Sequence, residues 1–415
     1  MKNKINIAII IVISGLINFL ITFILLTSYG ATDKLDSYFL AITIPQVLLS
    51  IFVYPLSGIV LSYLVEIDDD RKNNCDSQRF IYVISIAILS IFLALISYFI
   101  LRIISLYITI DDVLYELFLY SILSIPSFFL LNSFLVVYHS KSDFISYEKY
   151  NLLGSSYVVF VLLYYQGNIS IISLPLIILS KNLLVSFFMI KGLTFKKIYR
   201  HDFKFILEVS SRAKALILSS SITKLEPFIE RSIITSSGHG NMSIFYFTQQ
   251  LYMFLVQLVN KSYTATKVPF ITKKIICNES FSEIYINVKI RTFLFLLCLS
   301  CFLSIFLYFF SYYGFSFKKL NSENIDSIIC FSLFVFFISL FNLLRDYIYT
   351  LIFAFNRTDI VSYIDISSFL IFNLLKFIVF YLYGLQLFLI CCVLQSFFKF
   401  YISNYFVKKA IHDKY

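Results

Sequence analysis

Twelve apolar stretches, separated by short polar connections, fill almost all of the 415-residue chain. A helix of about 20 residues crosses the hydrocarbon core of a bilayer, and most of the stretches reach that length. The pattern therefore predicts an all-α polytopic membrane protein with about 12 transmembrane helices. We expect these helices at about residues 5–27, 37–64, 80–107, 115–138, 150–165, 171–190, 213–237, 242–268, 290–313, 326–350, 361–383 and 385–406.

The most basic connection falls between the sixth and the seventh stretch and divides the chain into two similar parts. Two lobes of six helices around a central cavity are typical of transporters built from structural repeats. All connections are short, so we expect no large outer domain that could house catalysis. The expected parts are an N-terminal lobe at 1–190, a basic cytoplasmic linker at 191–204, a C-terminal lobe at 205–407 and a cytoplasmic tail at 408–415.

Composition and charge support membrane residence and give an orientation. Hydrophobic residues make up 59% of the chain and charged residues 14%, whereas about a quarter of the residues of a soluble domain are charged. With both termini in the cytoplasm, twenty-one lysines and arginines fall in cytoplasmic segments and only Lys34, Lys318 and Lys319 fall outside. This asymmetry follows the positive-inside rule. The net charge of +10 therefore reflects topology and does not indicate nucleic-acid binding.

Signals of an enzyme are missing from the sequence. The four histidines fall in connections or the tail without the spacing of metal ligands, and no phosphate-binding loop of the form GxxxxGK[ST] occurs. The seven cysteines avoid the predicted outer loops, so they imply no disulfide framework. We expect no catalytic residue, no metal site and no cofactor.

Four charged residues lie in the middle of the seventh stretch: Lys224, Glu226, Glu230 and Arg231. Charge at bilayer depth is costly and usually lines a pathway instead of facing lipid. In a continuous helix Lys224 and Arg231, seven residues apart, share one face, and the two glutamates share another. The cluster either lines a cavity that binds cargo or forms an internal salt-bridge network that locks the bundle.

A proline lies among these charges, and other predicted helices hold further charged residues at bilayer depth, called deep charges below. Pro227 removes a helix hydrogen bond near Thr223 and is expected to bend the helix beside the cluster.

The deep cations outnumber the deep anions, which suits an anionic cargo such as a phosphate or diphosphate. For any single lysine, snorkelling or pairing with a neighbour is the alternative. The cations are Lys181, Lys224, Arg231, Lys261 and Lys376; the anions, candidates for charge balance or proton coupling, are Glu226, Glu230 and Asp365. Asp365 and Lys376 are expected on one helix face.

Three short segments carry a family resemblance. The first is a Gly-containing turn, an Asp-aromatic step and an apolar-Pro pair, from Gly30 through Asp36-Ser37-Tyr38-Phe39 to Ile44-Pro45. The second runs from Ile229-Glu230-Arg231 through Ser236-Ser237-Gly238 and Tyr246 to Pro269. The third is the elbow Asn356-Arg357-Thr358-Asp359-Ile360, followed by Gly384-Leu385. Together these segments resemble the MurJ/MviN family of lipid II flippases. The resemblance implies membership of the wider superfamily that also holds the Wzx polysaccharide flippases and the MATE drug exporters.

Departures from the family pattern bear on the cargo. The family's arginine pair after the apolar-Pro step falls here on Leu49-Ser50, its first-helix arginines fall in Ser14–Thr22, which holds no basic residue, and its Asp-Arg pair is Gln249-Gln250. The expected twelve helices also contrast with the fourteen of the lipid II flippases. The resemblance therefore implies a related glycan on polyprenyl diphosphate, as for the Wzx proteins.

The sequence thus predicts a flippase of the bacterial inner membrane that moves a polyprenyl-diphosphate-linked oligosaccharide, such as an O-antigen repeat unit, by alternating access. Its expected partners are this substrate, membrane lipids, and a polysaccharide polymerase with its chain-length machinery. Lys224, Arg231, Lys181 and Lys261 would hold the diphosphate, and Lys376 adds to the positive cavity. The alternatives are a lipid II flippase, a drug antiporter of the same superfamily, or a membrane glycosyltransferase or polymerase, which would need a large outer loop.

Overall fold

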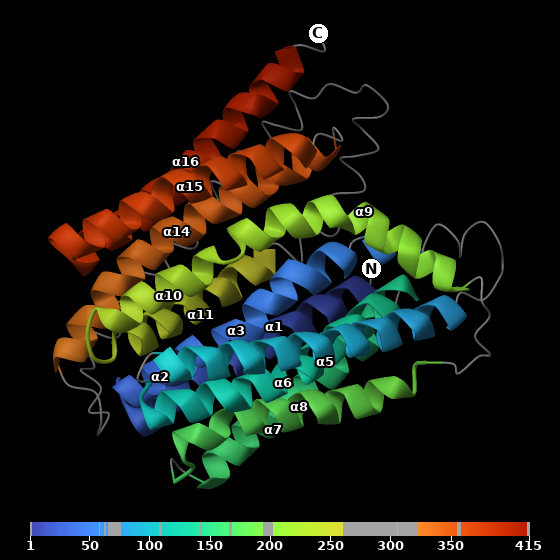
Figure 1. The fold of residues 1–415 in the computed structure, drawn as a ribbon, viewed down its shortest axis with the longest axis horizontal. Helices are drawn as coiled ribbons and strands as arrows, with labels where there is room; N and C mark the ends of the chain where they lie inside the picture. The colour runs from blue at the N-terminus through green and yellow to red at the C-terminus, as the bar shows by residue number, and fades with distance from the viewer. Residues whose placement is uncertain are drawn as a thin grey trace. The chain divides into compact units, whose positions relative to one another are not determined.

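The computed structural model shows helices throughout the residues that it describes, which confirms the all-α prediction (Figure 1). In these residues eight helical segments are long and apolar enough to cross a membrane. The described residues are 2–57, 59–61, 64, 76–107, 110–141, 143–165, 168–193, 202–259, 305, 322–354 and 358–412. The eight segments are Val12–Tyr29, Asp33–Leu61, Asp76–Tyr107, Asp112–Ser140, Ile171–Ile190, Asp326–Asp346, Ile360–Tyr383 and Leu385–Val407.

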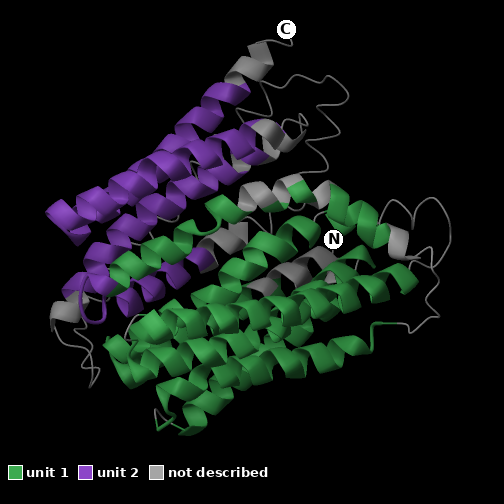
Figure 2. Ribbon diagram, in the orientation of Figure 1, with its two compact units in different colours: residues 1–235 green, residues 236–415 purple. Residues whose placement is uncertain are grey.

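The chain folds into two compact units, residues 1–235 and residues 236–415 (Figure 2). In unit 1, α1 packs on α7, α5 packs on α6, and α8 packs on both α6 and α7. The helices α2 and α3 also lie against α6. The elements of unit 1 are α1 (Lys2–Tyr29), α2 (Asp33–Ala41), α3 (Thr43–Leu48), the π-helix η1 (Leu49–Val53), α5 (Asp76–Tyr107), α6 (Asp112–Ser140), α7 (Phe144–Tyr165), the 3-10 helix η2 (Ile171–Ser173), α8 (Leu174–Ile190), α9 (Asp202–Thr223) and α10 (Glu226–Ser236).

Unit 2 contains α11 (Asn241–Val259), α14 (Ser322–Ala354), α15 (Thr358–Tyr383) and α16 (Leu385–His412). In it α14 packs on α11 and α16, and α15 and α16 form an antiparallel pair that turns at Gly384. The lobes expected at 1–190 and 205–407 remain a prediction. In the structure α9 and α10, expected in the C-terminal lobe, group with unit 1.

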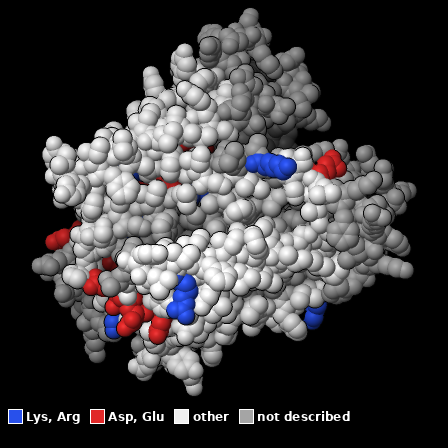
Figure 3. All heavy atoms as spheres, viewed as in Figure 1, with Lys and Arg blue, Asp and Glu red and all other residues white. Residues whose placement is uncertain are grey.

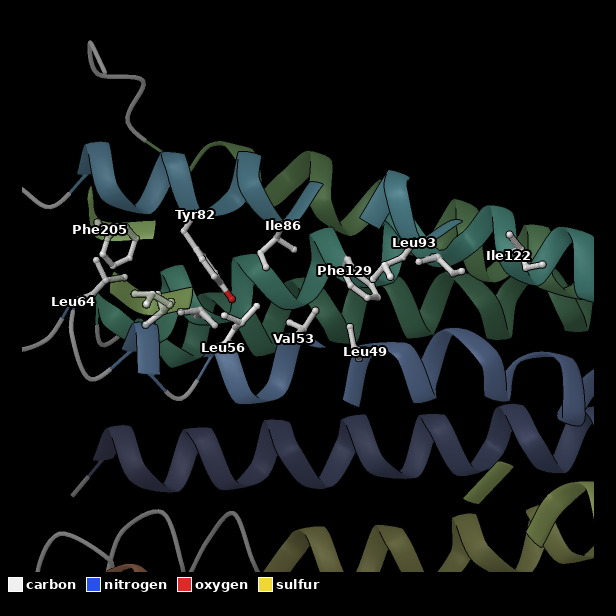
Figure 4. Close-up of a cluster of buried hydrophobic side chains, with 14 of the residues drawn as sticks. Leu49, Val53, Leu56, Leu64, Tyr82, Ile86, Leu93, Ile122, Phe129 and Phe205 are labelled. Atoms are coloured by element: carbon white, nitrogen blue, oxygen red, sulfur yellow. The ribbon is translucent and has the colours of Figure 1, made fainter. Parts of the chain in front are cut away.

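A hydrophobic core in unit 1 holds the second span against its neighbours (Figure 4). Leu49 and Val53 of η1 face Ile86 of α5 and Phe129 of α6, and Phe205 of α9 closes the same cluster. Inside a membrane such contacts stabilise the fold by van der Waals packing, because lipid chains are as apolar as these side chains. This packing fixes the position of η1, the irregular part of the second span.

The surface of the spanning helices is apolar, as a lipid environment requires. On α5 the exposed side chains Ile88, Phe92, Leu95 and Phe99 recur every three or four residues, which places them on one helix face. On the face drawn in Figure 3, residues other than Lys, Arg, Asp and Glu cover nearly all of the described surface. The chain is therefore a multi-pass membrane protein.

A buried polar cluster joins the ends of three helices in unit 1; we call it the Asp76 cluster. Asp76, the first residue of α5, lies 3.2 Å from Arg79 Nη1 and 3.4 Å from Lys141 Nζ. Arg79 Nε also donates to Ser140 Oγ of α6 at 2.9 Å. Lys141 Nζ donates to the Gly192 carbonyl, just after α8, at 2.8 Å. The cluster ties α5, α6 and α8 together at the end that the sequence assigns to the cytoplasm.

Candidate functional site

Two helical segments in unit 1 are broken, each beside a proline. The second span, Asp33–Leu61, begins with α2, a turn at Ile42, α3 and the π-helix η1. Pro45 has no N–H group, so the Ala41 carbonyl loses its helix partner. Irregular turns of this kind are frequent at functional sites.

The second break separates α9 from α10. α9 ends at Thr223 and α10 begins at Glu226. Around the break, the backbone N–H groups of Phe228 and Ile229 both donate to the Leu225 carbonyl at 3.1 Å. Pro227 cannot donate to Thr223, so the bend predicted from the sequence is confirmed and is a full interruption of the helix.

Arg231 joins the two broken segments. Its side chain is buried, and Nη1 donates to Thr43 Oγ1 at 2.7 Å and to Gln46 Oε1 at 3.1 Å, both on α3. Thr43 in turn donates to the Phe39 carbonyl of α2 at 2.8 Å. The guanidinium of α10 is therefore oriented by neutral side chains of the second span. We call Arg231, Thr43 and Gln46 the arginine junction.

The break separates Lys224 from Arg231, whereas Glu226 and Glu230 lie on α10 with Arg231. Lys224 lies in the turn between α9 and α10 and is exposed, whereas Arg231 is buried. The expected shared face of these two cations is wrong, because the helix is interrupted between them. Glu226 opens α10 and Glu230 lies half-buried on it. A carboxylate in the first turn, such as Glu226, interacts favourably with the helix dipole.

Lys181 lies apart from the arginine junction. It belongs to α8, which packs on α6 and α7, whereas Arg231 belongs to α10. Figure 1 shows α8 and α10 on opposite sides of unit 1. The structure thus does not bring Lys181 and Arg231 into one site. Of the other predicted residues, Lys261 and Arg357 lie outside the described residues.

In unit 2 the predicted partners Asp365 and Lys376 are separated along α15. Tyr349 of α14 donates to Asp365 Oδ1 at 2.8 Å. The Arg345 guanidinium lies 5.4 Å from the centre of the Tyr349 ring and 2.8 Å from Asp346 Oδ1. Lys376 is fully buried on the same helix, 0% exposed. Eleven residues of helix span about 16 Å, so Asp365 and Lys376 share a side of α15 without forming a direct pair.

The family-motif residues that the structure describes lie at helix ends or in buried positions. Gly30 adopts a φ of 74° and its N–H donates to the Leu26 carbonyl at 2.9 Å, which ends α1. A glycine is favoured at such a left-handed position because it has no Cβ. Asp36 is buried in α2 and Pro45 is buried in α3, while Asp359 lies in the first turn of α15.

Several polar residues of the described helices were not among the site residues predicted from the sequence. Thr43 and Gln46 became candidates only through their bonds to Arg231. Arg345 and Asp346 lie inside a predicted apolar stretch, so charge at bilayer depth was the signal that could have found them. Lys399 of α16 is buried as well, 7% exposed.

Comparison with known proteins identifies the fold. No protein-family model and no curated protein matches the chain. The solved structure of the lipid II flippase MurJ in its inward closed conformation superposes with a TM-score of 0.75 at 16% identity, over 97% of this chain and 87% of that one. An inward-facing multidrug-resistance MATE transporter of the MOP superfamily gives a TM-score of 0.67 at 14% identity, over 99% and 95% of the two chains. A MOP-superfamily transporter from Pyrococcus furiosus superposes with a TM-score of 0.64 at 13% identity, over 99% of this chain and 96% of that one.

The chain has the fold shared by MurJ and the MATE transporters. This confirms, at the level of fold, the resemblance read from Gly30–Pro45 and the other two segments. Because these structures align over nearly the whole chain, the likeness covers both units and not a single domain.

Proposed function

We propose that the chain is a flippase that moves a polyprenyl-diphosphate-linked oligosaccharide across the bacterial inner membrane by alternating access. The observation that carries the proposal is the arginine junction, where the broken second span meets the interrupted helix pair α9–α10 at a buried guanidinium. In transporters, substrate sites are typically formed by discontinuous helices near the middle of the membrane. The fold shared with MurJ and the MATE transporters agrees with this assignment.

The chemistry of the junction suits a phosphate group. A guanidinium has five N–H donors in a planar fork that matches phosphate oxygens. The bonds from Arg231 to Thr43 and Gln46 orient that fork beside the second span. Lys224, in the adjacent turn, is a second cation within the same broken helix. The proposed cargo is therefore recognised through its diphosphate, with the lipid tail left in the bilayer.

A drug antiporter and a lipid II flippase are the competing functions. Deleting the gene in its host and quantifying lipid-linked oligosaccharide in the membrane separates the three. The proposal predicts loss of surface polysaccharide with accumulation of the lipid-linked unit, and unchanged drug resistance. Lysis with accumulation of lipid II would support the peptidoglycan role. Drug sensitivity with normal polysaccharide would support the antiporter and contradict the proposal.

The proposed orientation places both termini and the 191–204 linker in the cytoplasm and the Gly238–Asn241 turn outside. A single cysteine at His239, in a cysteine-free background, is expected to react with a membrane-impermeant maleimide in intact spheroplasts. The same substitution at Lys196 should react only after the membrane is permeabilised, because the positive-inside rule places that connection in the cytoplasm. The reverse labelling pattern would invert the topology.

Energy coupling is expected to involve a carboxylate at bilayer depth. Glu230 and Asp365 are the candidates, and Asp365 already accepts a hydrogen bond from Tyr349. The amides Glu230→Gln and Asp365→Asn preserve size but cannot exchange a proton. We expect one of them to abolish stimulation of flipping by a pH gradient in proteoliposomes, with cargo binding retained. Equal stimulation of the wild type and both amides would remove the proton role and leave the membrane potential as the driving force.

A further inference from the structure

Lys181 is a deep cation for which, within the part of the chain that the structure describes, no carboxylate and no hydrogen-bond acceptor forms a pair. Arg231, by contrast, contacts Thr43 and Gln46. An unpaired cation in an apolar interior is costly unless an anion compensates it. Among the described residues, the half-buried Lys181 thus lacks the counter-charge that a bound anion would supply.

The depth of Lys181 rules out an escape to the membrane surface. It lies near the centre of the 20-residue span Ile171–Ile190. At 1.5 Å per residue, either end of that span is about 13–15 Å away along the helix, which is beyond the reach of a lysine side chain. The charge stays at the depth that a lipid headgroup reaches only while it crosses the bilayer.

The seam between α7 and α8 is shaped around this side chain. A Cβ on Gly154 of α7 would clash with Val185 Cγ2 and would lie 3.2 Å from Lys181 Cγ. The missing side chain thus lets the lysine stem lie across α7. One turn along the same seam, the hydroxyl groups of Tyr157 and Ser180 are 3.3 Å apart. The Ser180 hydroxyl donates to the Ile177 carbonyl at 2.8 Å, so Tyr157 is the donor in the pair with Ser180. The Lys181 ammonium and the Tyr157 O–H, which can rotate away from Ser180, are donors that suit phosphate oxygens.

The flanks of the seam are apolar and exposed. On α8 these flanking side chains include Leu183 and Phe187, and on α7 they include Leu153 and Phe160, each at least 47% exposed. In a membrane such a surface faces lipid chains and not water. An anion that reaches Lys181 along this surface must therefore be attached to a lipid.

We propose that the α7–α8 seam at Gly154, Tyr157, Ser180 and Lys181 is a second phosphate-binding position, separate from the arginine junction, which takes the phosphate of a polyprenyl lipid from the bilayer side. This inference rests on the proposed function, because that function supplies the class of ligand, a polyprenyl lipid with a phosphate. It adds a place on the outside of unit 1 where the lipid phosphate is held at membrane depth before or after its contact with Arg231.

The test measures the binding of polyprenyl phosphate to the full chain in nanodiscs of phosphatidylcholine, with polyprenol of the same length as the neutral control. Lys181→Gln is expected to weaken phosphate-dependent binding roughly tenfold or more, as for the loss of one charge-assisted hydrogen bond. Tyr157→Phe, which keeps the ring, should weaken it by a smaller factor. Lys191→Gln is the matched control, because Lys191 follows α8 at its exposed end, and should bind as the wild type does.

The outcomes separate this inference from the proposed function. If Lys181→Gln binds polyprenyl phosphate as tightly as the wild type while Arg231→Gln does not, the second position is wrong and the flippase proposal stands. If the wild type binds polyprenyl phosphate no better than polyprenol, both the second phosphate-binding position and the proposed function are wrong. Inorganic phosphate is added at the same concentration as polyprenyl phosphate. If it displaces the part of the binding that depends on Lys181, the ligand is a soluble anion and not a lipid.

Discussion

Replacing Arg231 with glutamine is expected to abolish export of the lipid-linked unit while leaving the amount of protein in the membrane close to that of the wild type. Glutamine keeps a polar side chain beside Thr43 and Gln46, which Arg231 contacts at 2.7 and 3.1 Å. The substitution removes the positive charge and the planar guanidinium of Arg231. Truncating a desolvated, hydrogen-bonded charge contact costs about 2 kcal/mol or more, which is roughly 30-fold in affinity. Surface polysaccharide, quantified against membrane protein by immunoblot, is the readout.

Two further variants define what that loss means. Arg231→Lys keeps the charge but not the bidentate geometry, so we expect intermediate export. Arg102→Gln removes an exposed arginine of α5 that donates to the Tyr98 hydroxyl at 3.3 Å, and should export normally. Full export by Arg231→Gln would show that the arginine junction is a structural contact only.

The largest effect on stability is expected from Asp76→Ala. Asp76 is buried, and its Oδ1 contacts Arg79 at 3.2 Å and Lys141 at 3.4 Å. Removing the acid breaks the buried ion pair with Arg79, and breaking a buried ion pair destabilises proteins by about 3–5 kcal/mol. Thermal unfolding in detergent should show a lowered midpoint, and less of the variant should accumulate in the membrane.

Asp143→Ala is the matched control for this prediction. Asp143 Oδ1 accepts the backbone N–H of Ser146 at 3.2 Å near the start of α7, so its loss should cost only about 1 kcal/mol. Equal midpoints for Asp76→Ala and Asp143→Ala would mean that the Asp76 cluster is not what holds the ends of α5, α6 and α8 together.

The membrane spans were predictable from the sequence because their physical cause is local. A run of about 20 apolar residues has few alternatives to a spanning helix, and the predicted stretch 171–190 coincides with the span Ile171–Ile190. The break at Pro227 was predictable for the same reason, since a proline removes one specific hydrogen bond. Helix periodicity then failed at Lys224 and Arg231, because it holds only while the helix is continuous.

The contacts of the candidate site were not predictable in this way. Thr43 and Arg231 are 188 residues apart in sequence, and no local pattern marks a threonine as the acceptor of a distant arginine. Asp365 and Lys376 were expected on one helix face. The structure shows that Asp365 accepts a hydrogen bond from Tyr349 of α14, a contact that helix spacing within α15 does not predict. Tertiary packing, not helix periodicity, chooses such partners.

The central claim is tested most directly by reconstitution. The purified chain is placed in proteoliposomes that contain a polyprenyl diphosphate carrying a short oligosaccharide, and a membrane-impermeant glycosidase reports how much of the lipid is exposed on the outer leaflet over time. The account predicts transfer of the diphosphate lipid by the wild type, strongly reduced transfer by Arg231→Gln, and no transfer of the same oligosaccharide on a neutral polyprenyl carrier. Transfer of both lipids at the same rate by the wild type and Arg231→Gln, or no transfer beyond that in protein-free liposomes, would contradict it.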